Sequence, residues 1–165
     1  MNIDKILSSV DHTLLLQTAT FNDIKVICDD GIKFNTASIC IPPCFVKEAK
    51  EYVQDKLAIC TVIGFPLGYT VTEAKVTEAK EAIAQGCNEI DMVINIGKLK
   101  DRNLEYVKND IKAVVDTAKG KALVKVIIES CLLTDEEKVI ACKLVKKVGA
   151  NFVKTSTGFS TGGAT

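Results

Sequence analysis

The side chain with the clearest potential for chemistry is Lys154, near the end of the 165-residue chain. Phe152 and Val153 precede it, and a run of hydroxyl and glycine residues, 155–158, follows it. This order predicts a short buried strand that leads into a polar loop. An ammonium among apolar neighbours is either surface charge or a group whose environment favours loss of its proton. Because the chain has 20 lysines and one arginine, a solvated surface charge is the ordinary expectation for any single lysine.

Other ionisable residues recur within or at the ends of apolar segments, and strand alternation groups them. Residues i and i+2 of a strand share a face, so Lys125 shares one with Ile127 and Glu129, while Asp91 shares one with Val93 and Asn95. If these faces point inward, two lysines, Asp91 and Glu129 lie near each other. A lysine beside another cation in a poorly hydrated pocket becomes a nucleophile toward carbonyls, and a carboxylate can move the protons of imine chemistry.

This constellation indicates an imine-forming lyase or aldolase. A structural ion pair inside a barrel accounts equally well for Asp91 or Lys125 taken singly. The hydroxyl- and glycine-rich loop after Lys154 favours a chemical role for that residue.

The elements that position these side chains follow one repeated pattern: an apolar run, a polar loop and an amphipathic helix closed by glycine. A short helix is predicted from about Ile3. Capping boxes at Thr20, Thr70 and Thr134 predict three helix starts, and Gly31 is expected to end the first of these helices. The predicted strands are residues 10–15, 36–41, 57–63, 89–94, 122–128 and 152–155.

Strands that alternate with helices predict parallel pairing through right-handed crossovers. An open doubly wound sheet and a (β/α) barrel both satisfy this pattern. The usual glycine-rich nucleotide-binding motifs are absent from the sequence, and functional groups at many strand ends are typical of a barrel. We therefore expect one domain, residues 1–165, that supplies about the first six strands of a (β/α)8 TIM barrel and is truncated after the sixth, since eight units need roughly 250 residues.

Composition excludes several classes of function. Lys+Arg and Asp+Glu are both 21, so no basic face for nucleic acid is implied. No apolar run approaches the roughly 20 residues of a membrane span, and the N-terminal residues lack the layout of a signal peptide. The seven cysteines contain no C-x-x-C pair, which favours buried free thiols in a cytoplasmic protein over a zinc or disulfide framework.

Six motifs occur in order along the chain, and together they carry a resemblance to a known family. They are Asp11-His12-Thr13-Leu14-Leu15, Ile39-Cys40-Ile41-Pro42-Pro43, residues 61–68 (TVIGFPLG), residues 89–95 (EIDMVIN), residues 125–129 (KVIIE) and residues 152–158 (FVKTSTG). The chain resembles the 2-deoxyribose-5-phosphate aldolases, class I aldolases built on a (β/α)8 barrel.

The resemblance implies a role for each matching residue. Lys154 matches the lysine that forms a Schiff base with the aldehyde substrate, and Asp91 matches the acidic residue of the proton relay, which works with an ordered water. Substrate-binding positions are matched by Asp11, Cys40, Lys125, Thr155 and Gly158. For Cys40, a small buried hydrophobe remains an equal alternative.

The implied reaction is the reversible cleavage of 2-deoxy-D-ribose 5-phosphate to D-glyceraldehyde 3-phosphate and acetaldehyde. No metal or organic cofactor is expected, the partners are a small sugar phosphate and an aldehyde, and a full-length protein is expected to be a homo-oligomer, dimer or tetramer. The family places a second lysine on the seventh strand and its main phosphate contacts after strands seven and eight, beyond this chain. A non-catalytic or sugar-phosphate-binding fragment, or an aldolase for another sugar phosphate, are the alternatives.

Overall fold

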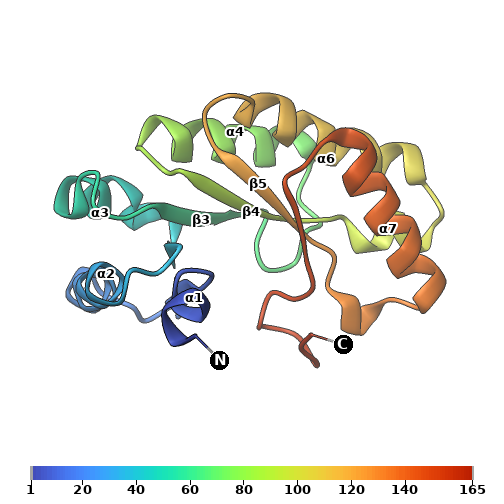
Figure 1. The fold of residues 1–165 in the computed structure, drawn as a ribbon. Helices are drawn as coiled ribbons and strands as arrows, with labels where there is room; N and C mark the ends of the chain where they lie inside the picture. The colour runs from blue at the N-terminus through green and yellow to red at the C-terminus, as the bar shows by residue number, and fades with distance from the viewer. Residues whose placement is uncertain (1, 165) are drawn as a thin grey trace. The chain divides into compact units, whose positions relative to one another are not determined.

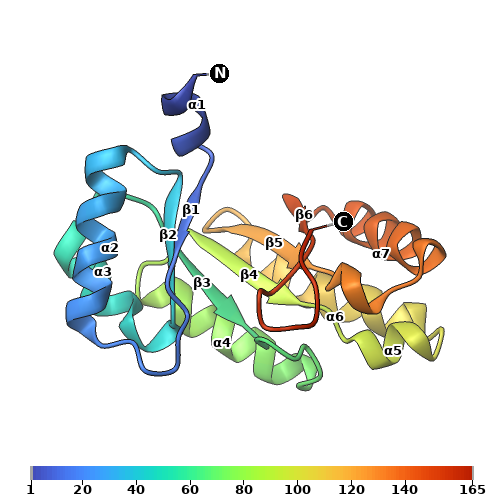
Figure 2. The same ribbon diagram turned by 90° about the horizontal axis from the view of Figure 1, so that it is seen from below.

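The computed structural model describes residues 2–164, which form two compact units. One unit extends to Val62 and includes Ala82–Glu89, and the other comprises Ile63–Glu81 and the chain from Ile90 onward. Figures 1 and 2 show the elements of both units as ribbons. In chain order the elements are α1 (Ile3–Leu7), β1 (Asp11–Thr13), α2 (Phe21–Phe34), β2 (Ser38–Ile41), η1 (Pro43–Phe45), α3 (Val46–Val53), β3 (Ile59–Ile63), α4 (Thr72–Ala84), β4 (Glu89–Val93), α5 (Ile96–Lys100), α6 (Leu104–Ala118), β5 (Leu123–Ile127), η2 (Ser130–Leu132), α7 (Asp135–Val148) and β6 (Phe152–Lys154).

The six strands follow one another in the sheet in the order in which they occur in the chain. β1 pairs with β2, β2 with β3 and β5 with β6, all in parallel. A doubly wound sheet reverses its strand order at a switch point, and this sheet has no such reversal. The sequential order therefore agrees with the predicted barrel-type winding, and all six predicted strands are present with somewhat shorter bounds.

In the first unit, α2 and α3 lie side by side and pack on the short parallel strands (Figure 2). All four residues of β2 are buried. Thr20 caps α2 through the predicted capping box with Asp23. The expectation that Gly31 ends this helix is wrong: α2 continues to Phe34 and ends at Asn35 in the left-handed conformation.

Packing explains why Gly31 lies inside the helix. A Cβ at this position would lie 2.6 Å from Leu57 Cδ2 and 3.1 Å from Ile39 Cγ2. The glycine therefore lets α2 approach the strand layer closely, and its function here is steric and not conformational.

In the second unit, α6 and α7 pack against each other beside β5 and β6. An apolar stripe recurs along α6 at helical spacing, and its members Val107, Ile111, Val114 and Ala118 are buried. One member of the buried face was not predicted: Asp110, which is 1% exposed. The short helices α5 and η2 were also not predicted, because five- and three-residue elements carry too little periodicity to be recognised.

The helix predicted after Thr70 is present as α4, but the predicted capping box at Thr70 does not form. The helix begins at Thr72, and the buried Thr70 hydroxyl makes no hydrogen bond within the described residues. The Thr72 hydroxyl donates instead to Asp110 Oδ1 at 2.8 Å. Tertiary contact with α6 thus replaces the local cap that the sequence pattern indicated.

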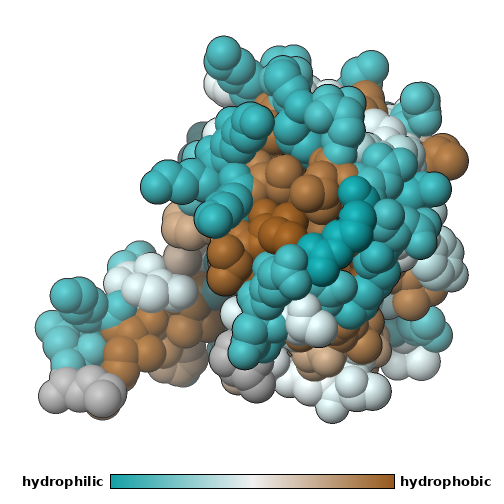
Figure 3. Space-filling view, turned by 90° about the vertical axis from the view of Figure 1, so that its right-hand side faces the viewer, coloured by the Kyte–Doolittle hydropathy of each residue, from teal (hydrophilic) through white to brown (hydrophobic). Residues whose placement is uncertain are grey.

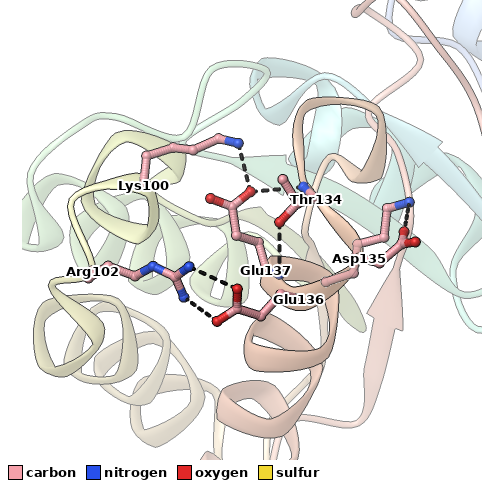
Figure 4. A network of polar contacts seen from close by, with 7 residues as sticks. Lys100, Arg102, Thr134, Asp135, Glu136 and Glu137 are labelled. Carbon is pink, nitrogen blue, oxygen red and sulfur yellow. Dashed lines mark hydrogen bonds and ion pairs between the residues drawn. The ribbon is translucent and has the colours of Figure 1, made fainter.

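The start of α7 is tied to α5 by a network of charged side chains (Figure 4). Thr134 and Glu137 form the predicted capping box. Lys100 Nζ donates to Glu137 Oε2 at 2.7 Å. Arg102 donates to both carboxylate oxygens of Glu136, at 2.9 and 3.1 Å. The hydrogen bond from Lys100, assisted by the backbone N–H of Thr134, lowers the pKa of Glu137.

The face turned toward the viewer in Figure 3 holds an apolar area framed by hydrophilic side chains. The strand β6 was expected to be buried, but Phe152 is 54% exposed and Val153 is 42% exposed. β6 is the last strand in the sheet order, and a strand in that position has no partner on its outer side to cover it. The expectation of a buried β6 is therefore wrong for the chain as it stands.

No helix within residues 2–164 is long and apolar enough to cross a membrane.

The loop between β3 and α4 depends on a glycine that no other residue can replace without rearrangement. Gly68 has φ +73°, and a Cβ there would lie 2.0 Å from the carbonyl oxygen of Ile94. Gly149 has a similar φ of +81° but no atom within 4 Å of an added Cβ. We expect Gly149→Ala to cost about 1 kcal/mol from the left-handed conformation alone, and Gly68→Ala to cost roughly 3 kcal/mol or more because overpacking adds to that strain. Equal losses in urea unfolding would contradict the close approach at Gly68.

The lowered pKa of Glu137 makes a pH-dependent contribution to stability. A carboxyl group whose pKa is lower in the folded than in the unfolded state stabilises the fold above its unfolded pKa, and this contribution is lost as the pH falls through the folded pKa. We therefore expect Glu137→Gln to lower the free energy of unfolding at neutral pH and to have a smaller effect in acid. Urea unfolding of both proteins across the acidic range measures this difference. Asp55→Asn alters another carboxyl group of lowered pKa, far from α7 in the sequence, and serves as a comparison. An effect of Glu137→Gln that grows in acid would contradict the lowered pKa of Glu137.

Candidate active site

Asp91 lies at the centre of a cluster of three charged side chains in the second unit. Its side chain is 0% exposed. Lys154 Nζ donates a hydrogen bond to Asp91 Oδ2, and Lys125 Nζ lies 3.2 Å from Asp91 Oδ1. The three residues come from β4, β5 and β6, so strand alternation places their side chains on one common face, as the sequence predicts.

The three side chains differ in their access to solvent. The Lys154 side chain is 33% exposed, whereas that of Lys125 is 10% exposed. A buried carboxylate requires compensating charge, and two ammonium groups supply it. The cluster therefore holds one partly exposed lysine, a buried carboxylate and a second, more deeply buried lysine.

Hydrogen bonds fix the strand that carries Lys154. The backbone N–H of Ile128 donates to the carbonyl oxygen of Lys154 at 3.0 Å, and that of Ser130 donates to Thr155 O at 2.8 Å. Thr155 is thus anchored through its backbone to the start of η2. The Ser156 hydroxyl is buried without a hydrogen bond in the described structure.

Glu129 holds the loop after β6. Its carboxylate accepts hydrogen bonds from the backbone N–H of Thr157, at 3.2 and 3.4 Å, and from the Thr157 hydroxyl. Glu129 has φ +51°, so the strand alternation that grouped it with Lys125 ends before this residue. Its contact with Thr157 was missed because a left-handed residue redirects the side chain in a way that alternation does not describe.

The remaining predicted site residue of this unit is Gly158. It has φ +83°, is exposed, and has open space where a side chain would lie. The left-handed conformation favours glycine here. Its suggested contact with a substrate stays a prediction.

Asp11 and Cys40 belong to the first unit. The hydroxyl of Ser38 donates to Asp11 Oδ1 at 2.8 Å, which ties the start of β1 to the start of β2. Cys40 is 0% exposed and pairs in register with Thr13 and Cys60. His12 lies 3.8 Å from Asp30. The substrate-binding roles of Asp11 and Cys40 stay predictions.

The expectation that the cysteines are buried free thiols is only partly correct. All seven are free, but Cys44 is exposed and Cys131 and Cys142 are half-buried. Cys131 Sγ lies 3.5 Å from Ser160 Oγ and 3.8 Å from Thr161 Oγ1. The hydrogen bond with Ser160, followed by those with Thr161 and the backbone of Gly162, lowers the pKa of Cys131.

Sequential parallel strands and a lysine–aspartate–lysine cluster on neighbouring strands are the arrangement expected of a (β/α) enzyme. Residues 5–164 match the model of the DeoC/LacD family of aldolases. A deoxyribose-phosphate aldolase from Clostridium botulinum (strain Alaska E43) is 54% identical over 165 residues, which are all of this chain and 74% of the relative. One from Lysinibacillus sphaericus is 59% identical over 157 residues, 94% of this chain and 70% of the relative.

Solved structures agree with the sequence relatives. A protein from Coccidioides immitis, proposed to be a deoxyribose-phosphate aldolase, matches with a TM-score of 0.97 and 38% identity over 100% of this chain and 65% of its own. The tetrameric deoxyribose phosphate aldolase from Aeropyrum pernix matches with a TM-score of 0.90 and 29% identity over 97% of this chain and 68% of its own. The chain belongs to the DeoC/LacD family of aldolases. Its fold is that of the first six strands of a TIM barrel, as the sequence predicts, and it spans about two thirds to three quarters of these relatives.

The pKa differences among the cysteines predict an order of reactivity. Burial raises the pKa of Cys28 to about 11 and that of Cys87 to about 12, whereas the pKa of Cys131 is lowered. Since the thiolate is the reactive species, we expect iodoacetamide at about pH 8 to modify Cys131 well before Cys28 and Cys87. Peptide mass spectrometry after timed labelling measures the order.

A matched variant tests the cause of the lowered pKa. Ser160→Ala removes the first of the hydrogen bonds to Cys131 and is expected to slow its labelling without altering that of exposed Cys44. Labelling of Cys28 at the same rate as Cys131 would contradict the assigned environments.

Proposed function

We propose that this sequence carries the catalytic centre of a deoxyribose-phosphate aldolase, which reversibly cleaves 2-deoxy-D-ribose 5-phosphate to D-glyceraldehyde 3-phosphate and acetaldehyde. The single observation that supports this best is the contact of a partly exposed lysine, Lys154, with the buried carboxylate of Asp91. The names of the relatives support the choice of substrate.

The reaction begins at the Lys154 amine. Asp91 accepts a proton from the Lys154 ammonium, and the neutral amine attacks the C1 aldehyde carbon of the open-chain sugar. Loss of water from the carbinolamine then gives an iminium ion. The contact between Nζ and the carboxylate provides a direct path for the protons that these steps move.

The carbon–carbon bond breaks in the iminium ion. A base removes the proton of the C3 hydroxyl, C3 becomes the aldehyde carbon of glyceraldehyde 3-phosphate, and the C2–C3 electron pair flows toward the iminium nitrogen to give an enamine. Protonation of the enamine at C2 and hydrolysis release acetaldehyde and restore the amine. Asp91, with an ordered water, is the proposed carrier of these protons.

Lys125 has a separate role in this scheme. It is buried and compensates Asp91, so it keeps a cation close to the reacting carbons when Lys154 is neutral. Asp11, Cys40, Thr155 and Gly158 are proposed to line the substrate site, with Gly158 on the phosphate side.

We further propose that the protein is a cytoplasmic homo-oligomer. The tetrameric structure of the Aeropyrum pernix relative supports this assembly. Light scattering coupled to gel filtration measures the state directly, and a strictly monomeric species at all concentrations would contradict it.

Trapping with borohydride tests the nucleophile. Acetaldehyde and borohydride are expected to add one ethyl group to Lys154, located by peptide mass spectrometry, because reduction makes the imine permanent. Lys154→Met is expected to abolish both the adduct and the cleavage of 2-deoxyribose 5-phosphate. Lys138→Met, which removes a surface lysine paired with Asp135, is the matched control and is expected to retain both. An adduct on another lysine alone would remove Lys154 from its role.

The proton relay has its own test. Asp91→Asn removes the proton acceptor and leaves the amide in its place, so turnover is expected to fall by about 10²–10⁴-fold. A substrate panel of other sugar phosphates separates this activity from that of a different imine-forming aldolase. Cleavage by Asp91→Asn at the wild-type rate would overturn the relay.

A further inference from the structure

A second buried ion pair lies in the same unit as the catalytic cluster, and the chemistry above does not use it. Lys75 on α4 and Asp110 on α6 are both 0% exposed in their side chains, with Nζ and Oδ2 2.6 Å apart. Neither residue is indicated by a sequence motif. Lys75 is one of 20 lysines, and Asp110 lies within an apolar stripe.

Both members of the pair make further hydrogen bonds. Lys75 Nζ also donates to the carbonyl oxygen of Val93 at 2.9 Å, and Asp110 Oδ1 accepts from the Thr72 hydroxyl at 2.8 Å. Burial lowers the pKa of Lys75, and the attraction of Asp110 opposes this shift. Each carboxylate oxygen of Asp110 therefore has a donor, and Lys75 has two acceptors.

The acceptor Val93 connects this pair to the catalytic cluster. Val93 is the last residue of β4, and it lies two residues after Asp91 on the same strand. Lys75 therefore binds the backbone of the short segment that presents Asp91 to Lys154 and Lys125.

The loop after β3 encloses the same lysine. Gly64 has φ +58°, and a Cβ there would lie 2.8 Å from Lys75 Cε. The Gly64 backbone N–H donates to Glu78 Oε2 at 2.7 Å, one turn after Lys75 on α4. Gly68, in the same loop, approaches the carbonyl oxygen of Ile94. The loop, the helix and the strand end thus enclose the Lys75 side chain, which is 0% exposed.

A fully buried ion pair is a weak source of stability, because desolvation of both ions offsets their attraction. Apolar residues of similar volume often replace such a pair without loss of stability. The Lys75–Asp110 pair, with Gly64 packed against Lys75, is therefore better explained by the geometry it imposes on the end of β4 than by a contribution to stability.

We propose that Lys75 and Asp110 are positioning residues for the aldolase reaction: they fix the C-terminal end of β4 and thereby hold the Asp91 carboxylate against the Lys154 amine. This inference rests on the proposed function, since the pair can position the reaction only if Asp91 and Lys154 carry it out. Lys75 and Asp110 touch no substrate in this scheme.

The test compares a double variant with a matched packing variant. Lys75→Met with Asp110→Leu removes both charges together and leaves no buried ion without a partner, so the chain is expected to fold. Its thermal midpoint is expected to be somewhat below that of the wild type, because Val93 O and the Thr72 hydroxyl lose these hydrogen bonds. Its kcat for cleavage is expected to fall at least tenfold with KM changed less than twofold, because Asp91 is displaced while the proposed substrate-lining residues Asp11, Thr155 and Gly158 are not altered. Ile111→Val loosens α6 at the next, equally buried residue without touching the pair, and it is expected to keep kcat.

Trapping provides a readout that does not need turnover. The rate of the borohydride-trapped ethyl adduct at Lys154 is expected to fall in the double variant in parallel with kcat. Lys75→Met alone serves as a second variant, and it is expected to be less stable than the double variant because Asp110 is left uncompensated.

The outcomes separate the two proposals. A wild-type chain that forms no adduct at Lys154 would overturn the proposed function, and the positioning role with it. A wild-type chain that forms the adduct, together with a folded double variant that forms it at the same rate and keeps its kcat, would overturn the positioning role alone. A double variant that fails to fold while Ile111→Val folds would also overturn it, because the pair would then be a source of stability.

Discussion

The constraint on which the rest of this structure depends is that a carboxylate shielded from water must find its compensation inside the protein. Asp91 satisfies it with two lysines from two other strands. This arrangement works only if three strands present side chains of the right length at the same height, and parallel strands in sequential order do so. The fold and the chemistry of the cluster therefore depend on each other. The parallel sheet brings distant parts of the chain together on one face of neighbouring strands, where a charge without a partner would be too costly.

The same unit contains a second buried carboxylate that is compensated by a lysine, the Asp110–Lys75 pair. The two lysines differ in their exposure to solvent, and this difference fits their proposed roles. Lys154 keeps a third of its side chain in contact with solvent, whereas Lys75 keeps none. The accessible amine is able to meet an aldehyde. The enclosed amine meets the backbone oxygen of Val93 and the carboxylate of Asp110, and a Cβ added at Gly64 would collide with its side chain. Reactivity and rigidity are thus obtained from the same residue type by a difference in enclosure.

Much of the fold was predictable from the sequence, and the errors have identifiable causes. The six strands are visible as apolar runs because buried parallel strands need apolar residues on both faces. Gly31 was misread because its use is to admit Leu57 and Ile39, a tertiary contact that no local rule contains. Thr70 was misread because Thr72 finds a better partner on α6. β6 was expected to be buried because its composition is that of a strand covered on both sides.

Within the site, alternation along the strands was enough to bring Asp91, Lys125 and Lys154 together, since all three lie in regular strands. It failed at Glu129, where the left-handed backbone turns the carboxylate toward Thr157. Strand alternation could not predict the pairing of Lys75 with Asp110, because these residues lie on two helices and are 35 residues apart in the sequence. The one available signal was an aspartate at a core position of an otherwise apolar helical stripe, which marks a buried charge that needs a partner but does not name it.

That long separation has a consequence for building hybrid proteins from members of this family. The Lys75–Asp110 pair joins α4 to α6 across β4, so a crossover placed between these helices, at β4 for example, inherits the lysine from one parent and its aspartate from the other. Where the second parent has an apolar residue at either position, the chimera contains one buried charge without compensation, although both parental segments are intact. Exchange of α4, β4 and α6 as a single block preserves the pair, which makes this block, and not the individual β/α repeat, the natural unit of recombination in this part of the barrel.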